Sequence, residues 1–248
     1  MPPGEAWYKR TRRFLHLADC PSHMYTLLRH LRHMLLLSSS LLVVVPGLAA
    51  DTAEEFRVAT EGYRYSFPRD HGAHEEFRTE WWYYTGQVTT KDGRPFGYEL
   101  TFFRRGMPRD QTKTLPSQWA VTQLYLAHFA VSDLSKGRFH YADKMSRAGL
   151  GKAGAAQDHL HAWIDRWSAE SPSAAPDTQI LRAAEGDMAI QLTVSPGKPL
   201  IIHGTDGISR KGSATGQASH YYSFTRLATT GTVTIGNESF DVTGTSWM

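Results

Sequence analysis

From residue 80 onward, apolar and polar positions alternate in short segments that are broken by turn residues. The stretch 80–90, EWWYYTGQVTT, is rich in aromatic and β-branched residues, and FGYELTFFRR at 96–105 has the same character. Between them lies KDGR, residues 91–94, whose Asp-Gly pair favours the tight turn of a β-hairpin. The pattern therefore predicts that these two stretches pair as antiparallel strands.

Further strand-like segments continue to the end of the chain, at 119–133, 139–145, 159–167, 178–196, 199–204, 218–231 and 232–244. Stretches rich in Gly, Pro and Ser separate them, as is typical of loops. The segment 178–196 contains its own turn at Glu185-Gly186-Asp187 and is interpreted as a second hairpin. No helical periodicity follows residue 51. The predicted fold class is therefore all-β, an antiparallel barrel or sandwich.

The segment 119–133 is apolar on both faces of a predicted strand. Tyr125 and Phe129 lie on one face, and Leu124 and Leu126 lie on the other. A strand that is covered on both faces either lies under a second layer or lines an apolar cavity. We therefore expect room for one small apolar ligand inside the fold.

Charge is distributed unevenly along the 248 residues. The formal net charge is +3, but residues 1–50 hold six Lys and Arg against two acids, which leaves the remainder at −1. A nucleic-acid-binding protein needs a basic surface to neutralise phosphates. This composition therefore speaks against a nucleic-acid partner.

The first 50 residues have the features of an export signal. Arg29 belongs to a cationic stretch, and the apolar run 34–50 ends in small residues, so cleavage is expected just before Asp51. Met24 is a natural start, and the run is short for a membrane span, although an uncleaved N-terminal anchor is the alternative. Cys20, the single cysteine, precedes the run, which excludes disulfides, a thiol nucleophile and a cysteine zinc site from the mature chain.

The densest group of polar and aromatic residues is FPRDHGAHEEFRTEWWYYTG, residues 67–86. A metal site here would use His71 and His74, but their spacing is not that of His-Glu-x-x-His and no third ligand is fixed, so we expect no metal. The loop 67–79 is either a solvated entrance in which Asp70 fixes a turn, or a pocket mouth that supplies an acid or a hydrogen bond.

The strand that follows presents two different faces. Glu80, Trp82 and Tyr84 share one face, and Trp81 and Tyr83 share the other. The inward tryptophan either plugs the core or shares a pocket with Glu80. In the second case, burial beside aromatic rings raises the pKa of the carboxyl group, which suits a general acid, and the rings stabilise a cation.

Two other positions leave the same choice between core and site. His128 interrupts an apolar strand and is either a buried, hydrogen-bonded histidine or an acid/base group that faces a cavity. Tyr221, Tyr222 and Ser223 raise the same alternatives. The sequence contains no Gly-x-Ser-x-Gly elbow, P-loop or dinucleotide fingerprint, so those enzyme classes have no support.

The chain contains, in this order, FPRDHGAH, FRTEWWYYTG, AHFAVSD, GISRKG, ASHYYSFTRL and VTGTSWM. Together these segments resemble the AttH and carotenoid 1,2-hydratase (hydroxyneurosporene synthase) family of lipocalin-like proteins, many of which are labelled secreted hydrolases. The resemblance covers about residues 62–248. It implies two consecutive calycin-type barrels, of which 67–248 forms the first after an N-terminal segment 51–66. The family continues after Ser-Trp-Met with Asp-x-Glu and a second barrel, so we expect this chain to lack the C-terminal domain.

The resemblance also implies a reaction and its residues. The implied reaction adds water to the terminal double bond of an acyclic carotenoid and needs no cofactor. The catalytic positions would be Glu80, Asp70 and His128. The ligand-binding positions would be His71, Trp81, Trp82, Tyr84, Tyr222 and Trp247. An acid of the absent continuation would share in the chemistry.

The sequence thus predicts an exported, lipocalin-like protein of the periplasm or the exterior that adds water to, or hydrolyses, a long carotenoid- or lipid-like substrate. The alternatives are a non-catalytic carrier of such a ligand and a subunit that serves an ABC-type export system. The expected partner is a hydrophobic small molecule, and membrane association is expected to be peripheral at most.

Overall fold

The computed structural model describes residues 56–108, 121–214 and 216–248. The expected signal peptide at 24–50, its cleavage site and Cys20 lie outside the described residues. Within these ranges, no helix reaches the length and apolar character that a bilayer crossing requires.

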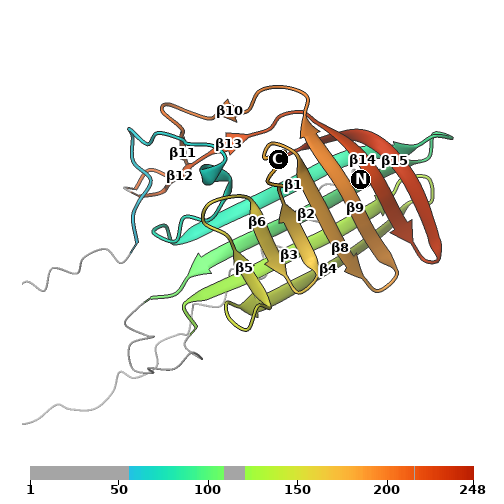
Figure 1. Ribbon diagram of the computed structural model, residues 1–248, viewed down its shortest axis with the longest axis horizontal. Coiled ribbons are helices and arrows are strands. Elements are labelled where there is room, and N and C mark those ends of the chain that lie inside the picture. Colours follow the sequence, from blue (N-terminus) through green and yellow to red (C-terminus); the bar gives the residue numbers. More distant parts are fainter. Residues whose placement is uncertain (1–55, 109–120, 215) are drawn as a thin grey trace, which may run out of the picture. The chain divides into compact units, whose positions relative to one another are not determined.

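The described chain consists almost entirely of strands (Figure 1). A short 3-10 helix, η2 (Arg69–His71), precedes them. The strands are β1 (Thr79–Thr90), β2 (Pro95–Gly106), β3 (Gln123–Asp133), β4 (Arg138–Arg147), β5 (Ala153–Ala155), β6 (His161–Ile164), β7 (Trp167–Glu170), β8 (Gln179–Glu185), β9 (Met188–Pro196), β10 (Ile201–Ile202), β11 (Ile208–Arg210), β12 (Ala218–His220), β13 (Tyr222–Ser223), β14 (Leu227–Ile235) and β15 (Glu238–Trp247).

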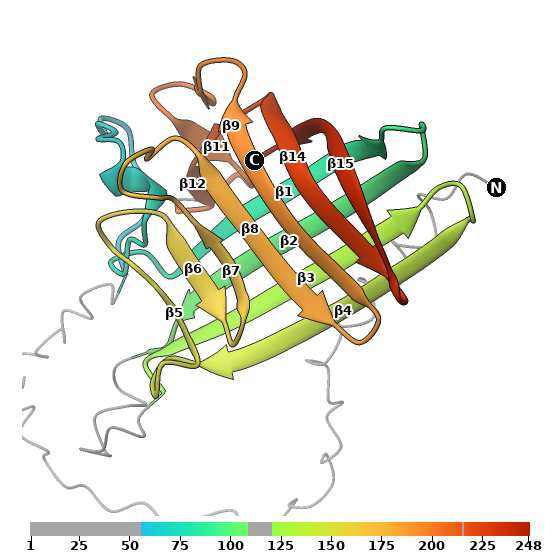
Figure 2. The same cartoon turned by 45° about the vertical axis from the view of Figure 1, so that its right-hand side comes forward.

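Eleven of these strands form one antiparallel sheet, in the order β4-β3-β2-β1-β15-β14-β9-β8-β7-β6-β5. The sheet curls until β6, near one edge, contacts β3 and β4 at the other (Figure 2). The result is a nearly closed barrel, so the predicted all-β, lipocalin-like barrel is confirmed. Two small ribbons, β10 with β13 and β11 with β12, stand beside it.

Both predicted hairpins form. β1 and β2 pair in register from Thr79↔Arg105 to Thr89↔Pro95. The turn between them depends on Gly93, whose φ of 91° lies in the left-handed region that glycine adopts freely. β8 and β9 pair around Gly186, with Glu185 opposite Met188. In both cases the local turn chemistry determines which residues pair.

The barrel interior is filled by large side chains from alternating positions. On β3, Tyr125 and Phe129 point inward and are buried, and the ring of Phe129 packs edge-on against the buried Trp167, with centroids 5.6 Å apart. Leu124 and Leu126, on the outer face, are only partly buried. The expectation that both faces of this strand are fully covered is therefore wrong, because nothing in the described ranges forms a second layer over the outer face of β3.

Close approach of strands explains one glycine in the wall. Gly86 of β1 lies opposite Tyr98 and Ser246, whose hydroxyl oxygens are 2.6 Å apart, and Thr229 Oγ1 is also 2.6 Å from Ser246 Oγ. A Cβ atom at Gly86 would lie 2.6 Å from Tyr98 Cε1 and closer still to Ser246 Oγ. Only glycine leaves room for this buried row of hydroxyl groups.

We predict that Gly86→Ala lowers the free energy of unfolding by about 1–3 kcal/mol, because the methyl group overpacks the wall. Gly97→Ala on β2 is the matched control, since its Cβ would meet nothing closer than 3.6 Å. Urea unfolding with an unchanged m-value measures both variants. Equal stability of the two variants would contradict the explanation.

Candidate functional site

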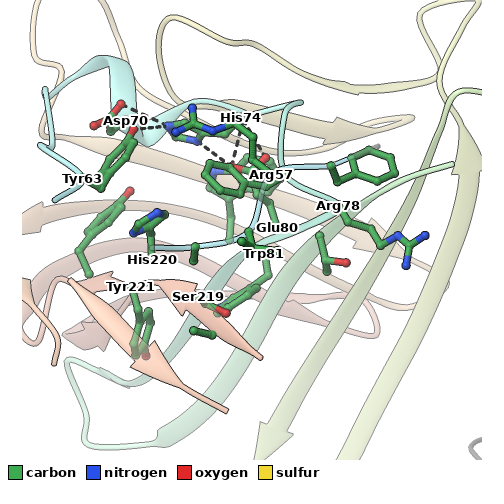
Figure 3. Close-up of a pocket in the computed structure, with 18 of the residues that line it drawn as sticks. Arg57, Tyr63, Asp70, His74, Arg78, Glu80, Trp81, Ser219, His220 and Tyr221 are labelled. Atoms are coloured by element: carbon green, nitrogen blue, oxygen red, sulfur yellow. Dashed lines mark hydrogen bonds and ion pairs between the residues drawn. The ribbon is translucent and has the colours of Figure 1, made fainter. Parts of the chain in front are cut away.

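A pocket of about 880 Å³ lies at the end of the barrel where β1 begins (Figure 3). Its walls come from the N-terminal segment 56–65, the loop 70–78, the first residues of β1 and the β11–β12 ribbon. Both faces of β1 contribute, since Glu80 and Trp82 point inward and Trp81 and Tyr83 point outward. The pocket therefore sits at the rim of the barrel and extends over its outer wall.

Aromatic rings form much of the lining. Tyr63 lies against His220, with ring centroids 4.5 Å apart, and Phe77 meets the other side of His220 at 5.4 Å. Trp81 and Tyr221 lie 6.2 Å apart. Mostly apolar walls with a few placed polar groups are the usual construction of a small-molecule site. This pocket therefore suits an apolar or conjugated ligand.

The loop that closes one side is fixed by Asp70, directly after the start of η2. Its carboxylate accepts a hydrogen bond from the backbone N–H of Ser66 at 2.7 Å and one from Arg69 at 3.1 Å. Asp70 and His71 are buried, and Asp70 lines the pocket. The loop is thus not a solvated entrance: Asp70 fixes a turn and also belongs to the pocket mouth.

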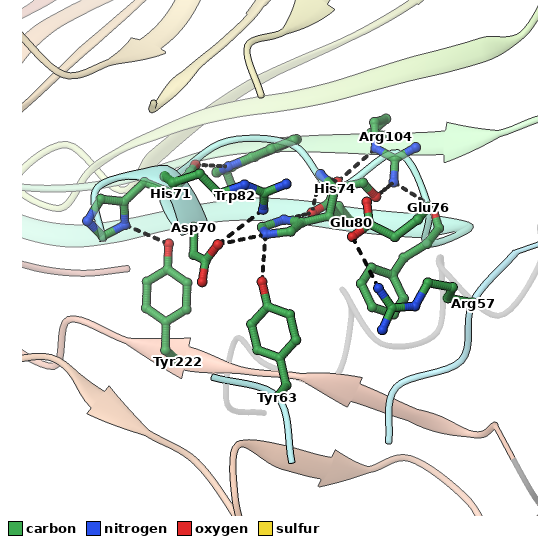
Figure 4. Close-up of polar contacts among 12 residues, drawn as sticks. Arg57, Tyr63, Asp70, His71, His74, Glu76, Glu80, Trp82, Arg104 and Tyr222 are labelled. Carbon is green, nitrogen blue, oxygen red and sulfur yellow. Dashed lines mark hydrogen bonds and ion pairs between the residues drawn. The ribbon is translucent and has the colours of Figure 1, made fainter. Parts of the chain in front are cut away.

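Glu80 is the centre of a buried ion-pair network (Figure 4). Its Oε2 accepts hydrogen bonds from Arg104 Nε and from the backbone N–H of His74, both at 2.8 Å, and its Oε1 lies 2.7 Å from His74 Nδ1. Arg104 is fully buried and also donates to the carbonyl oxygens of His74 and Phe77. The network ties β1 and β2 to the loop before β1.

The ionisation of Glu80 differs from the sequence-based expectation. Burial by itself would raise the pKa of this carboxyl group, but the hydrogen bond from His74 and the charge of Arg104 outweigh it and hold the pKa below the usual value. The expected raised pKa is therefore wrong. Aromatic neighbours alone suggested desolvation, whereas the fold places two cations beside the carboxylate.

His74 lies between two carboxylates. Its Nε2 is 3.2 Å from Asp70 Oδ1, and its Nδ1 faces Glu80. Burial alone would lower the pKa of His74, but the bonds to Glu80 and Asp70 raise it above the usual value. Burial would raise the pKa of Asp70, but hydrogen bonds from the backbone of Ser66 and from His74 hold it below the usual value. The hydroxyl of Tyr63, which lines the pocket, lies 3.2 Å from the same Nε2. Both carboxylates thus favour the protonated form of His74 beside the pocket.

His71 has the opposite character. It is fully buried, and burial lowers its pKa to about 4, so the ring is neutral at physiological pH. Its Nδ1 lies 2.9 Å from the hydroxyl of Tyr222, which lines the pocket and whose pKa burial raises. Two histidines three positions apart therefore have pKa values shifted in opposite directions. Each contacts one pocket tyrosine (Figure 4).

The structure brings six of the nine predicted site residues to this region: Asp70, His71, Glu80, Trp81, Trp82 and Tyr222. Trp82 is buried, and its Nε1 donates to the carbonyl oxygen of His71 at 2.9 Å. Tyr84 points into the barrel core, and Trp247 is exposed on β15. His128 is also exposed and packs against Phe103 on the outer wall.

The prediction that His128 is buried or faces a cavity is therefore wrong. Its strand is paired on both sides, by β2 and β4, and the alternation that buries Ala127 and Phe129 turns His128 outward. An apolar run along the chain did not distinguish the inner from the outer face.

Tyr63, His220 and Arg104 were not identified in the sequence, and His74 was considered there only as a metal ligand. The alternation Tyr63-x-Tyr65-x-Phe67 in the segment ahead of the barrel was a usable signal of a buried face. Arg104 follows Leu100 and Phe102 on the inward face of its strand, which indicated a buried charge. Within the described ranges, no group of three or more His, Cys, Asp or Glu side chains is arranged to hold a metal ion.

Residues 58–248 match the AttH-like family. Among solved structures, this chain is 34% identical to a putative AttH from Nitrosomonas europaea, with a TM-score of 0.67, over 77% of this chain and 56% of that chain. Kievitone hydratase from Nectria haematococca shares the fold at 11% identity and a TM-score of 0.52, over 78% and 55%. This chain thus spans little more than half of each neighbour. No curated protein matches.

We predict that Glu80→Gln lowers the free energy of unfolding by about 3–5 kcal/mol, because it leaves the guanidinium of Arg104 buried without a counter-charge. Glu75→Gln is the control, since this neighbouring acid is exposed. Denaturant unfolding compares the two. A Glu80→Gln variant as stable as the control would show that the ion pair does not hold the rim together.

The two histidines predict a maximum of stability near pH 6.5. His71, whose pKa is depressed, costs stability as the pH falls from about 6.5, the unfolded value, towards 4. His74, whose pKa is raised, contributes stability that is fully present below about 6.5 and lost as the pH rises through its folded pKa. Each slope is at most about 1.4 kcal/mol per pH unit.

Urea unfolding between pH 4.5 and 9, a range chosen around the ordinary histidine pKa, separates the two effects. His74→Gln should remove the alkaline slope and keep the acid one, and His71→Gln should do the reverse. Identical pH profiles of the two variants would contradict the opposite directions of the two pKa shifts.

Proposed function

Because the chain belongs to the AttH-like family, as the match over residues 58–248 shows and as the sequence motifs predicted, we propose that it adds water to, or hydrolyses, a long apolar substrate held in the rim pocket. The observation that carries this proposal is that two histidines beside one pocket have pKa values shifted in opposite directions, that of His71 down and that of His74 up. Pairs of groups whose environments push their pKa values apart mark the acid and the base of a reaction.

His74 is the proton source on the acid side. As an imidazolium it holds a proton between Asp70 and Glu80, and the hydroxyl of Tyr63 connects its Nε2 to the pocket at 3.2 Å. A proton passed through Tyr63 reaches a substrate carbon or a leaving oxygen. In this arrangement Glu80 and Asp70 set the charge of His74 and do not touch the substrate.

The base side consists of His71 and Tyr222. The neutral His71 accepts at Nδ1 the hydroxyl proton of Tyr222, while the Tyr222 oxygen takes a proton from the attacking water. Addition of water to a carbon–carbon double bond then balances: one carbon gains the proton from the acid side, and the other gains the hydroxyl group. Exchange with solvent returns both histidines to their starting charges.

The kievitone hydratase neighbour shows that a hydratase can have this fold. At 11% identity, the likeness supports the fold of this chain and not its reaction. The structural neighbours are longer than this chain, which covers 56% of the first and 55% of the second. The proposed site therefore includes groups outside the described residues. These groups would complement the aromatic walls described above.

A carrier function is the second candidate, favoured by one observation. Asp70 and Glu80, the two pocket carboxylates, are already bound to Arg69, His74 and Arg104, so neither is a free acid. A carrier would bind the same apolar ligands without changing them. The export route predicted from the leader is compatible with either candidate.

We predict that the full-length protein converts acyclic terpenoid alkenes to tertiary alcohols that carry heavy oxygen when the reaction is run in ¹⁸O-labelled water. Tyr222→Phe should lower turnover by about 10²-fold or more, because it removes the proton path to His71. Ligand affinity should stay unchanged. Tyr141→Phe, on the exposed strand β4, is the control.

Tight binding without any labelled product would favour the carrier. Equal turnover of Tyr222→Phe and the control would remove Tyr222 and His71 from the mechanism while leaving the pocket as the substrate site.

A further inference from the structure

The charges inside the pocket are already balanced, and those at its edge are not. Asp70 and Glu80 are each paired with cations of the protein. At the edge, Arg57 faces Glu76 only at 3.8 Å, and Arg78 lies over the ring of Phe56. Among the described residues, no acid lies within ion-pair distance of Arg78. The edge therefore carries an excess of positive charge.

Lys211, directly after β11, is the cation at this edge that contacts two aromatic rings of the pocket. Its Nζ lies 5.1 Å from the ring centroid of Tyr221 and 5.8 Å from that of Trp81, and both rings line the pocket. Its polar partner is the hydroxyl of Ser209 at 3.0 Å. No carboxylate in the described part of the chain pairs with it, so an ammonium with three donors keeps two of them for a ligand.

The two rings place this ammonium at one end of the pocket. In Figure 3, Tyr221 lies on the opposite side of the pocket from Asp70 and His74. An elongated ligand whose apolar chain lies along the aromatic walls would thus have one end at Lys211 and its reacting part near His74 and Tyr222. Cation–π contact with two rings limits where the ammonium can move.

The charges of Arg57 and His74 also act in this part of the pocket, at His220. Its pKa is lowered, first by burial and then by the charges of Arg57 and His74. Positive charge that focuses in a partly apolar cleft attracts an anionic ligand group. A single ammonium matches a singly charged carboxylate, whereas a phosphate usually engages several donors or a forked guanidinium.

We propose that Lys211 receives the carboxylate of the substrate, and that this site therefore binds long-chain unsaturated acids in preference to neutral molecules with the same chain. This inference rests on the proposed function and specifies its substrate class. The chain of the acid packs on Trp81 and Tyr221, and its double bond reaches the two histidine–tyrosine pairs.

The test compares oleate with oleyl alcohol, which has the same chain and double bond but a neutral end. Titration calorimetry on the full chain, below the concentration at which either lipid forms micelles, gives both affinities. We expect oleate to bind about tenfold more tightly or better, which is about the gain of one charge-assisted hydrogen bond. The difference should shrink as salt is added.

Lys211→Met should lower the affinity for oleate to that of the alcohol and leave the alcohol unaffected, and Lys211→Arg should restore most of the preference for the acid. Lys91→Met is the matched control, since Lys91 is exposed in the β1–β2 turn, at the end of β1 remote from the pocket. It should bind both lipids like the unchanged protein.

Each of three other outcomes would overturn a different part of the proposal. Equal affinities for oleate and oleyl alcohol in the unchanged protein would overturn the carboxylate site and leave the apolar pocket of the proposed function intact. Equal weakening of both lipids by Lys211→Met would show that Lys211 only packs on the rings. Absence of binding by both lipids would overturn the inference together with the proposed apolar substrate.

Discussion

The site depends on the buried contact between Arg104 of β2 and Glu80 of β1. A guanidinium that is wholly withdrawn from water needs every donor satisfied, and this one engages Glu80, two backbone carbonyl oxygens and Gln123. Two of those acceptors belong to the loop between η2 and β1. A residue pair in the barrel wall thus fixes the loop that forms the pocket mouth, and the loop in turn positions His71 and His74.

From that contact follows the division of charge between the two histidines. Bonds to the two carboxylates raise the pKa of His74, whereas His71 is buried beside Trp82 and Tyr222 and stays neutral. The two histidines are only three residues apart, but the turn at η2 buries the side chain of His71 among apolar residues and leaves that of His74 at the pocket. Acid and base character therefore arise from one short turn.

The position of the pocket also changes the view of the fold. A lipocalin-like barrel suggests a ligand in the lumen, yet here Trp167 and Phe129 fill the interior, and the N-terminal segment and the β11–β12 ribbon build a pocket over the rim. At the edge of that pocket, Lys211 pairs with no carboxylate of the described residues, while the pocket acids are paired internally. An amphipathic substrate, with its charged end outward, suits this arrangement better than a hydrocarbon does.

The sequence by itself determined the all-β class, both hairpins and the importance of the stretch 67–86, because period-two alternation and Asp-Gly or Glu-Gly-Asp turns act locally. Its motifs also led to the family and to six residues of the site. It could not assign the exposure of His128 or the ionisation of Glu80. Those depend on which strands pair and on the approach of Arg104, 24 residues away, and only the tertiary structure decides which charges share a dry environment.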